Sequence, residues 1–312
     1  MRLSKILLAI LIASAAVWVG FFVAGRRAEK PAKDLTAPGL GAQAQAYLLP
    51  VSEANYLPIR DFNVVEPLVG ARAAGLFDVR SERFLYAKNI GQQLPVASLT
   101  KLMTAAVVIE SLALNKTFTV AAEDINVDGK GADLYKGEQI RGGDLLKIML
   151  IKSSNDAALT FNTDARREGL NLIGKMNEKA GTIGMNDSKF TEPAGLDDDG
   201  SFSTVSDLIK LVRYVNRYPI IWEMLTTRSA DVSSIDGQFK HHLLNTNRLL
   251  DEMPGIIGGK TGYTDGALET MVLEISINGG RDRLISVVLG AADRFAETKK
   301  LIDWGLSAYS WK

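Results

Sequence analysis

Hydrophobic and polar positions repeat with two periods along the chain, and the shorter period appears near both ends of the predicted domain. Residues 71–80 and 83–89 are two short runs joined by a polar turn, which is the pattern of a β-hairpin. Residues 270–277 and 283–289 are rich in aliphatic and β-branched residues and predict two more strands. The sequence therefore predicts strands on both sides of a central segment.

The central segment, from about residue 115 to 242, is mainly helical in pattern, with a glycine-rich interruption at 129–143. Helices are predicted at 145–150, from Ala157 onward, at 176–185, at 206–218 with Ser203 or Thr204 as the cap, and finally at 295–309. Strands at both ends of one domain indicate a single sheet with a helical insertion between its parts. We therefore expect an α+β fold, an antiparallel sheet flanked by helices.

The chain begins with a stretch long and apolar enough to cross a membrane. Residues 6–25 carry no charge, and roughly 20 helical residues span a bilayer core of about 30 Å. A secretory signal usually has a shorter apolar run and a small-x-small cleavage site, of which 23–25 is only a passable example. We expect residues 1–27 to be an uncleaved anchor, with a cleaved signal as the alternative. The proline-containing stretch 28–67 then predicts a linker to a domain at 68–312.

Composition excludes several classes of function. Lys plus Arg equals Asp plus Glu at 36 each, so no basic excess indicates a nucleic acid partner. The absence of cysteine excludes disulfides, thiolate metal sites and a cysteine nucleophile. The two histidines, His241 and His242, are adjacent and fit a polar strand or loop better than a metal site. We expect no cofactor and no metal.

The residues Ala97-Ser98-Leu99-Thr100-Lys101 open a long apolar run at 102–109. Positions three apart share a helix face, so the Ser98 hydroxyl and the Lys101 amine can touch. The run is apolar nearly all round, which predicts a buried helix. Desolvation disfavours the ammonium form, and a neutral amine can accept the serine proton. The spacing predicts a nucleophile beside its base, although Ser-x-x-Lys occurs by chance roughly once in a chain of this length.

Two later motifs strengthen this prediction. Ser153-Ser154-Asn155-Asp156 lies at a junction between two predicted helices, where such residues also serve as helix caps. Lys260-Thr261-Gly262 lies on or beside a predicted strand. The period of two places Lys260 and Gly262 on one face, and a glycine there permits the close approach of another backbone.

In this order, Ser98-x-x-Lys101, Ser153-x-Asn155 and Lys260-Thr261-Gly262 resemble the motifs of penicillin-binding proteins and class A β-lactamases. Longer stretches resemble the serine D-alanyl-D-alanine carboxypeptidases, the low-molecular-mass penicillin-binding proteins: residues 94–105, 154–158, 176–177, 245–247 and 258–264. The resemblance covers about residues 71–312. It implies a β-lactamase/transpeptidase-like fold whose helical subdomain is the insertion at about 115–242.

The resemblance implies a serine DD-carboxypeptidase that removes the terminal D-Ala from peptidoglycan stem peptides through an acyl-enzyme on Ser98. Lys101 would be the base. Ser153 would relay the proton to the leaving amine, and Asn155 would hydrogen-bond the substrate amide. The backbone N–H groups of Ser98 and Tyr263 would hold the oxyanion, because fixed donors cost no reorganisation when charge develops.

The resemblance also implies that Lys260 and Thr261 meet the terminal carboxylate and that Gly262 and Tyr263 belong to the substrate-binding site. Arg294 matches a family arginine implicated in carboxylate binding, over a short, gapped stretch. β-Lactams would then be covalent inhibitors. The Glu-x-x-Leu-Asn segment of class A β-lactamases is missing, and the nearest glutamate is Glu192 in Glu-Pro-Ala-Gly-Leu. Penicillin is therefore expected to bind and stay.

Three alternatives remain open at this stage: a β-lactamase of the same fold, a DD-endopeptidase of the same fold, and a catalytically silent scaffold that binds the cell wall. Many of the proteins that this chain resembles carry a C-terminal β-domain with an amphipathic anchor, whereas this chain stops soon after Trp304. Residues 6–25 would replace that anchor in the cytoplasmic membrane. This requires an extracytoplasmic catalytic domain, which is secreted if the segment is cleaved.

Overall fold

The computed structural model describes residues 57–125, 127, 133–197 and 200–311. The predicted anchor at 1–27 and most of the predicted linker lie outside the described residues. Among the helices of the described part, none has the length and apolar character needed to cross a bilayer.

The described residues form the following elements. The strands are β1 (Ile59–Arg60), β2 (Ala71–Asp78), β3 (Arg83–Lys88), β4 (Thr117–Thr119), β5 (Gln139–Arg141), β6 (Ser229–Ser233), β7 (Lys240–Leu244), β8 (Ile256–Thr264), β9 (Leu268–Ile277), β10 (Asp282–Ala291) and β11 (Tyr309–Ser310). The α-helices are α2 (Thr100–Ser111), α3 (Gly142–Ile151), α4 (Asn155–Arg167), α5 (Leu172–Thr182), α6 (Val205–Val215), α7 (Pro219–Thr226), α8 (Leu249–Glu252) and α9 (Arg294–Ala308). The 3₁₀ helices are Ala97–Leu99, Ala122–Asp124 and Asn278–Gly280.

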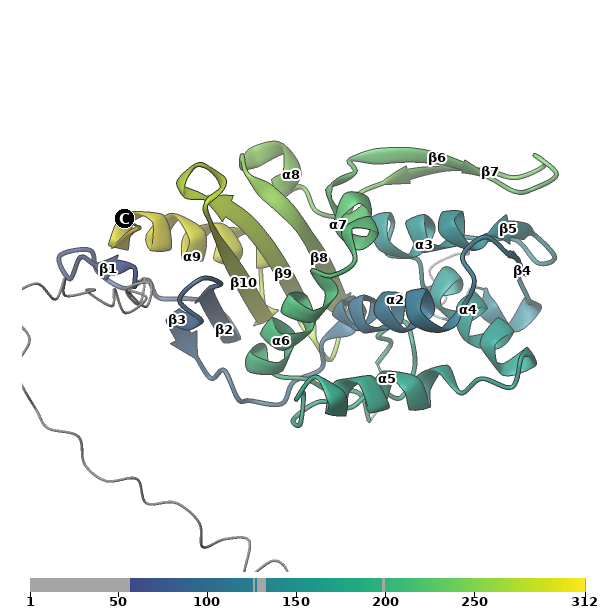
Figure 1. Cartoon of the computed structure of the whole chain (residues 1–312), viewed down its shortest axis with the longest axis horizontal. Coiled ribbons are helices and arrows are strands. Elements are labelled where there is room, and N and C mark those ends of the chain that lie inside the picture. The colour runs from purple at the N-terminus through teal and green to yellow at the C-terminus, as the bar shows by residue number, and fades with distance from the viewer. Residues whose placement is uncertain (1–56, 126, 128–132, 198–199, 312) are drawn as a thin grey trace, which may run out of the picture. The chain divides into compact units, whose positions relative to one another are not determined.

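A five-stranded antiparallel sheet in the order β3-β2-β10-β9-β8 forms the centre of the domain (Figure 1). The predicted hairpin is β2–β3, and the two strands predicted near the other end of the chain are β9 and β10. β2 pairs with β10, with Gly75 opposite Val287. The sheet is thus assembled from both ends of the domain, which confirms the predicted α+β fold.

Helices cover both faces of this sheet, with α9 on one face and α6 and α7 on the other (Figure 1). Side chains alternate between these faces because the period of a strand is two residues. On β9, Met271 and Leu273 pack in the core beneath α9, whereas Val272 between them packs in the core shared with α2. The sheet therefore holds its long strands firmly in place, including β8 with its lysine motif.

Helix α2 is buried along most of its length, as its apolar run predicted. Every residue from Thr100 to Val108 is buried. The prediction of a capped helix after 204 is also confirmed, since the Thr204 hydroxyl accepts a hydrogen bond from the Asp207 N–H at 3.1 Å at the start of α6. Helix α7 was not predicted.

The segment predicted as mainly helical also contains two small hairpins, β4–β5 and β6–β7. Their strands have three to five residues. Runs this short show too little alternation to be recognised in a sequence. The two histidines lie in β7, where the prediction of a polar strand or loop is confirmed, and the His241 imidazole pairs with the Glu138 carboxylate.

The last part of the predicted linker, which ends at residue 67, packs on the domain. Strand β1 pairs with β11 at the other end of the chain, with Arg60 opposite Tyr309. The Arg60 guanidinium lies 5.0 Å from the Trp304 ring and 5.3 Å from the Tyr309 ring, and it donates to the Val64 carbonyl at 2.8 Å. Such stacking contacts depend on residues far apart in the chain, so the local proline pattern did not indicate them.

Candidate active site

A cleft of about 490 Å³ lies between the sheet and the helical part of the domain. It is lined by residues from five places in the sequence: Ser98, Val127, Asn155, Gly195–Asp197 and Tyr263–Asp265. Two of the residues predicted to carry chemistry, Ser98 and Asn155, therefore open into one cavity although they are 57 positions apart in the sequence.

The predicted nucleophile and base are in contact. Lys101 Nζ lies 2.8 Å from Ser98 Oγ, 2.7 Å from Asn155 Oδ1 and within hydrogen-bonding distance of the Ala194 carbonyl oxygen. The amide and carbonyl oxygens can only accept, whereas the serine hydroxyl can donate or accept. A neutral Lys101 amine can therefore keep both of these acceptors and still receive the Ser98 proton through its lone pair.

Backbone strain concentrates beside these chemical groups. Ala97, which precedes the nucleophile, has φ +49°, and Ser153 has φ +65°. Left-handed conformations cost of order 1–3 kcal/mol in non-glycine residues and tend to occur at functional sites. Gly195, with φ +81°, packs on this segment so closely that a Cβ atom would lie 1.9 Å from the Ala97 carbonyl oxygen. Only glycine fits there.

Strand β8 lies against the nucleophile through Gly262. A Cβ atom at this position would lie 2.5 Å from Thr270 Oγ1 and 2.9 Å from the Ser98 nitrogen. The predicted close approach at this glycine is therefore confirmed. It places the backbone of β8 beside the backbone of Ser98. In this arrangement, one N–H donor from each segment can bind the same oxyanion.

Lys260 links the second motif to the third. It is 1% exposed, and its Nζ donates to Ser153 Oγ at 2.6 Å and to the Thr261 carbonyl at 2.8 Å. Burial, followed by the positive charges of Lys101 and Arg294, holds the pKa of Lys260 well below 10.5. Lys260 therefore faces Ser153 from within the protein rather than from the open cleft.

Arg294 lies beneath the end of β8. Its Nη1 donates to the Gly262 carbonyl at 2.8 Å and lies 4.0 Å from Glu269 Oε1. Arg294 therefore contacts the backbone of the Lys-Thr-Gly motif itself. Tyr263, the next residue, has a side chain that is half exposed and donates to Asp265 Oδ1 at 2.9 Å.

Two residues of the site were not assigned a role from the sequence. Thr246 Oγ1 lies 2.6 Å from Thr261 Oγ1, in contact with the predicted carboxylate site. Its signal was the Asn-Thr-Asn run at 245–247, which contributed to the resemblance. The second residue is Glu192, whose carboxylate accepts hydrogen bonds from the N–H groups of Ala194 at 2.7 Å, Leu196 at 2.9 Å and Gly195 between them.

Glu192 therefore shapes the turn that supplies an acceptor to Lys101, because the Ala194 carbonyl belongs to that turn. Burial raises the pKa of the Glu192 carboxyl, and the turn's N–H groups and the Lys101 charge oppose this rise. A carboxylate engaged by three N–H groups is poorly suited to activate water on an acyl-enzyme. This arrangement counts against the β-lactamase alternative.

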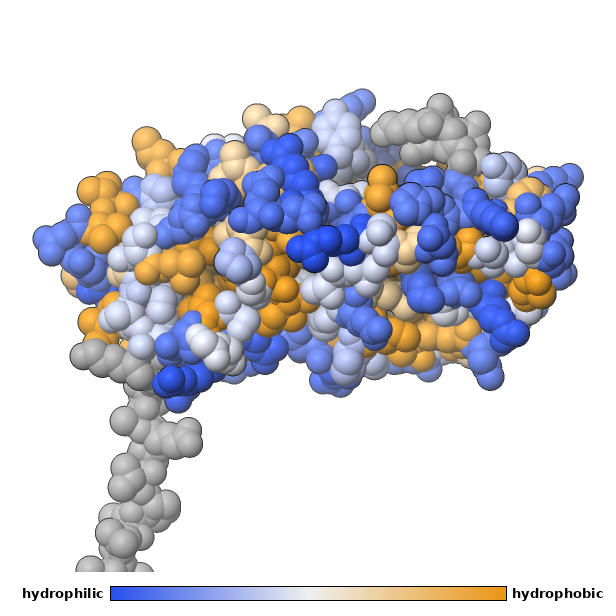
Figure 2. Space-filling view, turned by 90° about the horizontal axis from the view of Figure 1, so that it is seen from above, coloured by the Kyte–Doolittle hydropathy of each residue, from blue (hydrophilic) through white to orange (hydrophobic). Residues whose placement is uncertain are grey.

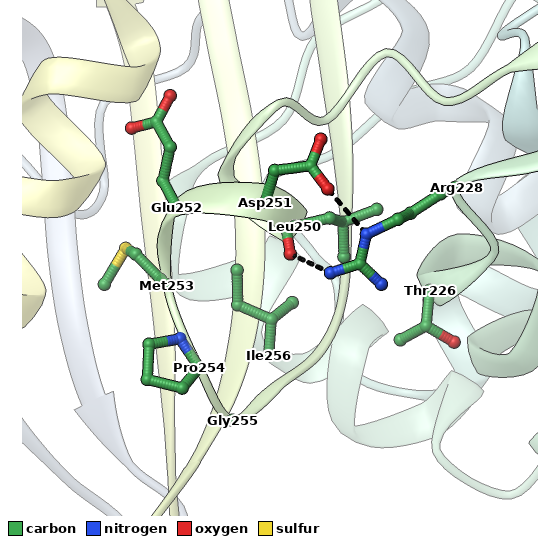
Figure 3. Close-up of a pocket in the computed structure, with 9 residues that line it drawn as sticks. All are labelled: Thr226, Arg228, Leu250, Asp251, Glu252, Met253, Pro254, Gly255 and Ile256. Atoms are coloured by element: carbon green, nitrogen blue, oxygen red, sulfur yellow. Dashed lines mark hydrogen bonds and ion pairs between the residues drawn. The ribbon is translucent and has the colours of Figure 1, made fainter.

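A second cavity, of about 370 Å³, lies between α7, α8 and the start of β8 (Figure 3). The Arg228 guanidinium crosses it and bonds to the Asp251 carboxylate and the Leu250 carbonyl (Figure 3). The residues that line it include no serine or lysine. The nucleophile–base pair thus identifies the cleft at Ser98 as the candidate active site.

The chain is similar to known proteins over most of its length. Residues 61–293 match the D-alanyl-D-alanine carboxypeptidase family. The D-alanyl-D-alanine carboxypeptidase DacF of Bacillus subtilis is 31% identical over 247 residues, which cover 77% of this chain but only 63% of that protein. A D-alanyl-D-alanine endopeptidase of Pseudomonas aeruginosa is 30% identical and covers 73% of this chain and 74% of its own length. Ampicillin-bound penicillin-binding protein D2 of Listeria monocytogenes superposes with a TM-score of 0.65 at 30% identity, covering 78% of this chain and all of that one.

Proposed function

The chain belongs to the D-alanyl-D-alanine carboxypeptidase family, and from this premise we propose that it is a serine hydrolase that removes the terminal D-Ala from peptidoglycan stem peptides. The observation that carries the proposal is the contact of Lys101 Nζ with both Ser98 Oγ and Asn155 Oδ1 at the base of the cleft. This arrangement combines an activated nucleophile, its base and an amide that can bind a peptide.

In the acylation step, Ser98 Oγ attacks the carbonyl carbon between the two D-alanines and passes its proton to Lys101 Nζ. The oxygen of the tetrahedral intermediate takes the negative charge and is held by the backbone N–H groups of Ser98 and Tyr263. The C–N bond then breaks as Ser153 relays the proton from Lys101 to the leaving amine, which returns Lys101 to its neutral form, and D-alanine departs. Water next attacks the ester carbonyl and gives a proton to the neutral Lys101 amine. The ester C–O bond then breaks, Ser98 Oγ takes that proton back from Lys101 Nζ, and the shortened peptide leaves with a free carboxyl group.

The terminal carboxylate of the substrate lies at the Lys-Thr-Gly end of β8. The hydroxyl pair of Thr246 and Thr261 offers donors there. Lys260 contributes positive charge from beneath Ser153, and Arg294 contributes it from beneath Gly262. A carboxylate needs such charge and such donors together, since neither alone compensates its loss of hydration.

A lowered pKa of Lys260 makes carboxylate binding depend on pH. Above that pKa the amine is neutral, and a bound carboxylate favours its ammonium form. We therefore expect a carboxylate-bearing β-lactam to bind the Ser98→Ala protein with proton uptake, and to bind more weakly as the pH rises through that pKa. Titration calorimetry in buffers of different ionisation enthalpy measures both quantities. Proton release, or uptake that persists in Lys260→Met, would contradict this expectation.

Glu192 is expected to position Lys101 through its turn. In Glu192→Gln, an NH₂ group replaces one of the oxygens that face the three N–H donors, at a cost of about 1–2 kcal/mol, so acylation should slow roughly tenfold. Loss of a nearby negative charge also favours the neutral form of the Lys101 amine. The acylation rate should therefore rise at a lower pH than in the wild type. The measurement is the rate of penicillin acylation against pH, with the exposed Glu223→Gln of α7 as the control. If the dependence of the acylation rate on pH is unchanged in Glu192→Gln, the role of Glu192 is purely structural.

The direct test of the proposed function is wild-type protein with a D-Ala-D-Ala peptide and with penicillin. We expect catalytic release of D-alanine, and with penicillin a long-lived adduct that intact-mass and peptide mapping assign to Ser98. Rapid turnover of nitrocefin by each molecule would support a β-lactamase instead. A protein that forms no adduct and releases no D-alanine would be a scaffold.

DD-endopeptidase activity is the second candidate, because some curated relatives of similar identity carry that name. The same acyl-enzyme chemistry serves both reactions, and the difference lies in the leaving group. A cross-linked muropeptide dimer distinguishes them: an endopeptidase converts it to monomers, whereas a carboxypeptidase releases only D-alanine from pentapeptide monomers.

The domain is proposed to act outside the cytoplasmic membrane, where peptidoglycan lies, with residues 6–25 as its anchor. The length and apolar character of that segment support this location. Fractionation of cells that express the full chain tests it. Full-length protein in the membrane fraction is expected, and mature protein cut after residue 25 in the medium or periplasm would support cleavage.

A further inference from the structure

An exposed apolar rim lies where the described chain enters the domain. We define the rim as Phe62, Val65 and Leu68, which are 88%, 84% and 94% exposed. Within the described residues, these are the three most exposed large hydrophobic side chains. They recur every third residue, so the three exposed side chains come from one short segment rather than from scattered positions.

Aromatic residues lie next to the rim. The Trp304 and Tyr309 rings are 5.7 Å apart, the Tyr309 and Trp311 rings are 6.4 Å apart, and all three side chains are at the β11 end of the domain. The Arg60 guanidinium joins this group to the rim, since it lies 5.0 Å from the Trp304 ring and 5.6 Å from the Phe62 ring. Trp304 is buried, with 6% of its surface exposed, whereas Tyr309 and Trp311 are partly exposed. A partly exposed tyrosine and tryptophan beside exposed apolar groups are typical of the interface between membrane and water.

The rim lies at the end of the domain formed by β1 and the C-terminal part of α9, whereas the helical part lies at the opposite end (Figure 1). Figure 2 shows hydrophobic residues at the surface of the β1 end. The cleft lies between the sheet and the helical part, so it is set back from the rim. A flat surface that contacts the β1 end would leave the cleft open.

The sequence connects this end of the domain to the predicted anchor. Only residues 26–56 separate the anchor from Leu57, and a chain of that length reaches at most roughly 110 Å when fully extended. Because the anchor is in the same chain, contact between the rim and the bilayer is an intramolecular event. A weak affinity is sufficient under such tethering.

We propose that the rim inserts into the headgroup region of the bilayer that holds residues 6–25, so that the β1–β11 end of the domain lies on the membrane and the cleft is held at a distance from it. This inference rests on the proposed anchorage. It is independent of the catalytic chemistry, which is measured separately below.

The absence of cysteine allows a label at any single position. Full-length Phe62→Cys, Val65→Cys and Leu68→Cys proteins, labelled with an environment-sensitive fluorophore, are reconstituted into phosphatidylcholine and phosphatidylglycerol vesicles. Some vesicles contain lipids with a nitroxide near the headgroup. The matched control is Leu244→Cys, an apolar position in β7 that is 62% exposed. We expect blue-shifted emission and at least twofold quenching by the nitroxide lipid at the three rim positions, and neither effect at 244.

Three results would overturn the proposal. The first is hydration of the rim labels equal to that of the label at 244. The second is an emission shift without quenching by the nitroxide lipid, which would mean that protein covers the rim. The third is failure of the full chain to float with the vesicles, which would contradict the proposed anchor as well. Penicillin acylation of each labelled protein in detergent, at the wild-type rate, shows that the fold and the proposed catalytic function are intact whichever result is obtained.

Discussion

Replacing Ser98 by alanine is expected to reduce D-alanine release by about 10⁴-fold or more, because the acyl-enzyme then has no oxygen on which to form. Penicillin should leave no covalent adduct. Reversible binding of a D-Ala-D-Ala peptide should persist, since Asn155, Thr261 and the N–H donors of the cleft remain. The measurements are D-alanine release, intact mass after exposure to penicillin, and peptide affinity by calorimetry.

Ser154→Ala is the matched control for this variant. Ser154 is a buried serine of the neighbouring motif whose hydroxyl caps α4 by accepting from the Ala157 N–H at 3.3 Å. Its loss should lower stability by about 1 kcal/mol and leave the penicillin adduct in place. D-Alanine release at the wild-type rate by Ser98→Ala would assign the nucleophile to another residue.

The second large effect is expected at Lys101. Arginine keeps the positive charge and the donors but cannot be deprotonated in a protein, so Lys101→Arg removes the base. General base catalysis contributes typically 10²–10⁴-fold, and the larger side chain must also fit where Lys101 is 0% exposed. We expect acylation by penicillin to slow by about 10³-fold or more. Lys101→Met, which has a similar shape and no proton acceptor, should lose activity to a similar extent.

Lys147→Arg in α3 provides the control, because Lys147 is a surface residue paired with Asp144 at 2.8 Å and its side chain is 42% exposed. It should acylate at the wild-type rate. The double variant Ser98→Ala/Lys101→Arg should be no less active than Ser98→Ala alone, since the two groups act as one unit. Additive losses, or fast acylation by Lys101→Arg, would show that another group accepts the serine proton.

Features that depend on neighbouring residues were predicted from the sequence. The contact between Ser98 and Lys101 follows from a spacing of three positions at a helix start, and the structure confirms it. The hairpin at 71–89 and a helix cap at Ser203 or Thr204 were also predicted from local patterns, and the structure shows that Thr204 is the cap of α6. The α+β class followed from the order of the elements along the chain, because strands at both ends of one domain must share a sheet.

Other features are set by packing between distant segments, and only the tertiary structure revealed them. The two further acceptors for Lys101 come from 54 and 93 residues away, on α4 and on a turn shaped by Glu192. The pairing of β1 with β11, which places the apolar rim, joins opposite ends of the domain. No local pattern records which surfaces meet when the helices close on the sheet, because that is decided by the burial of apolar area over the whole domain. The sequence by itself thus determined the contact between Ser98 and Lys101 and the fold class, and the tertiary structure decided what surrounds these two residues.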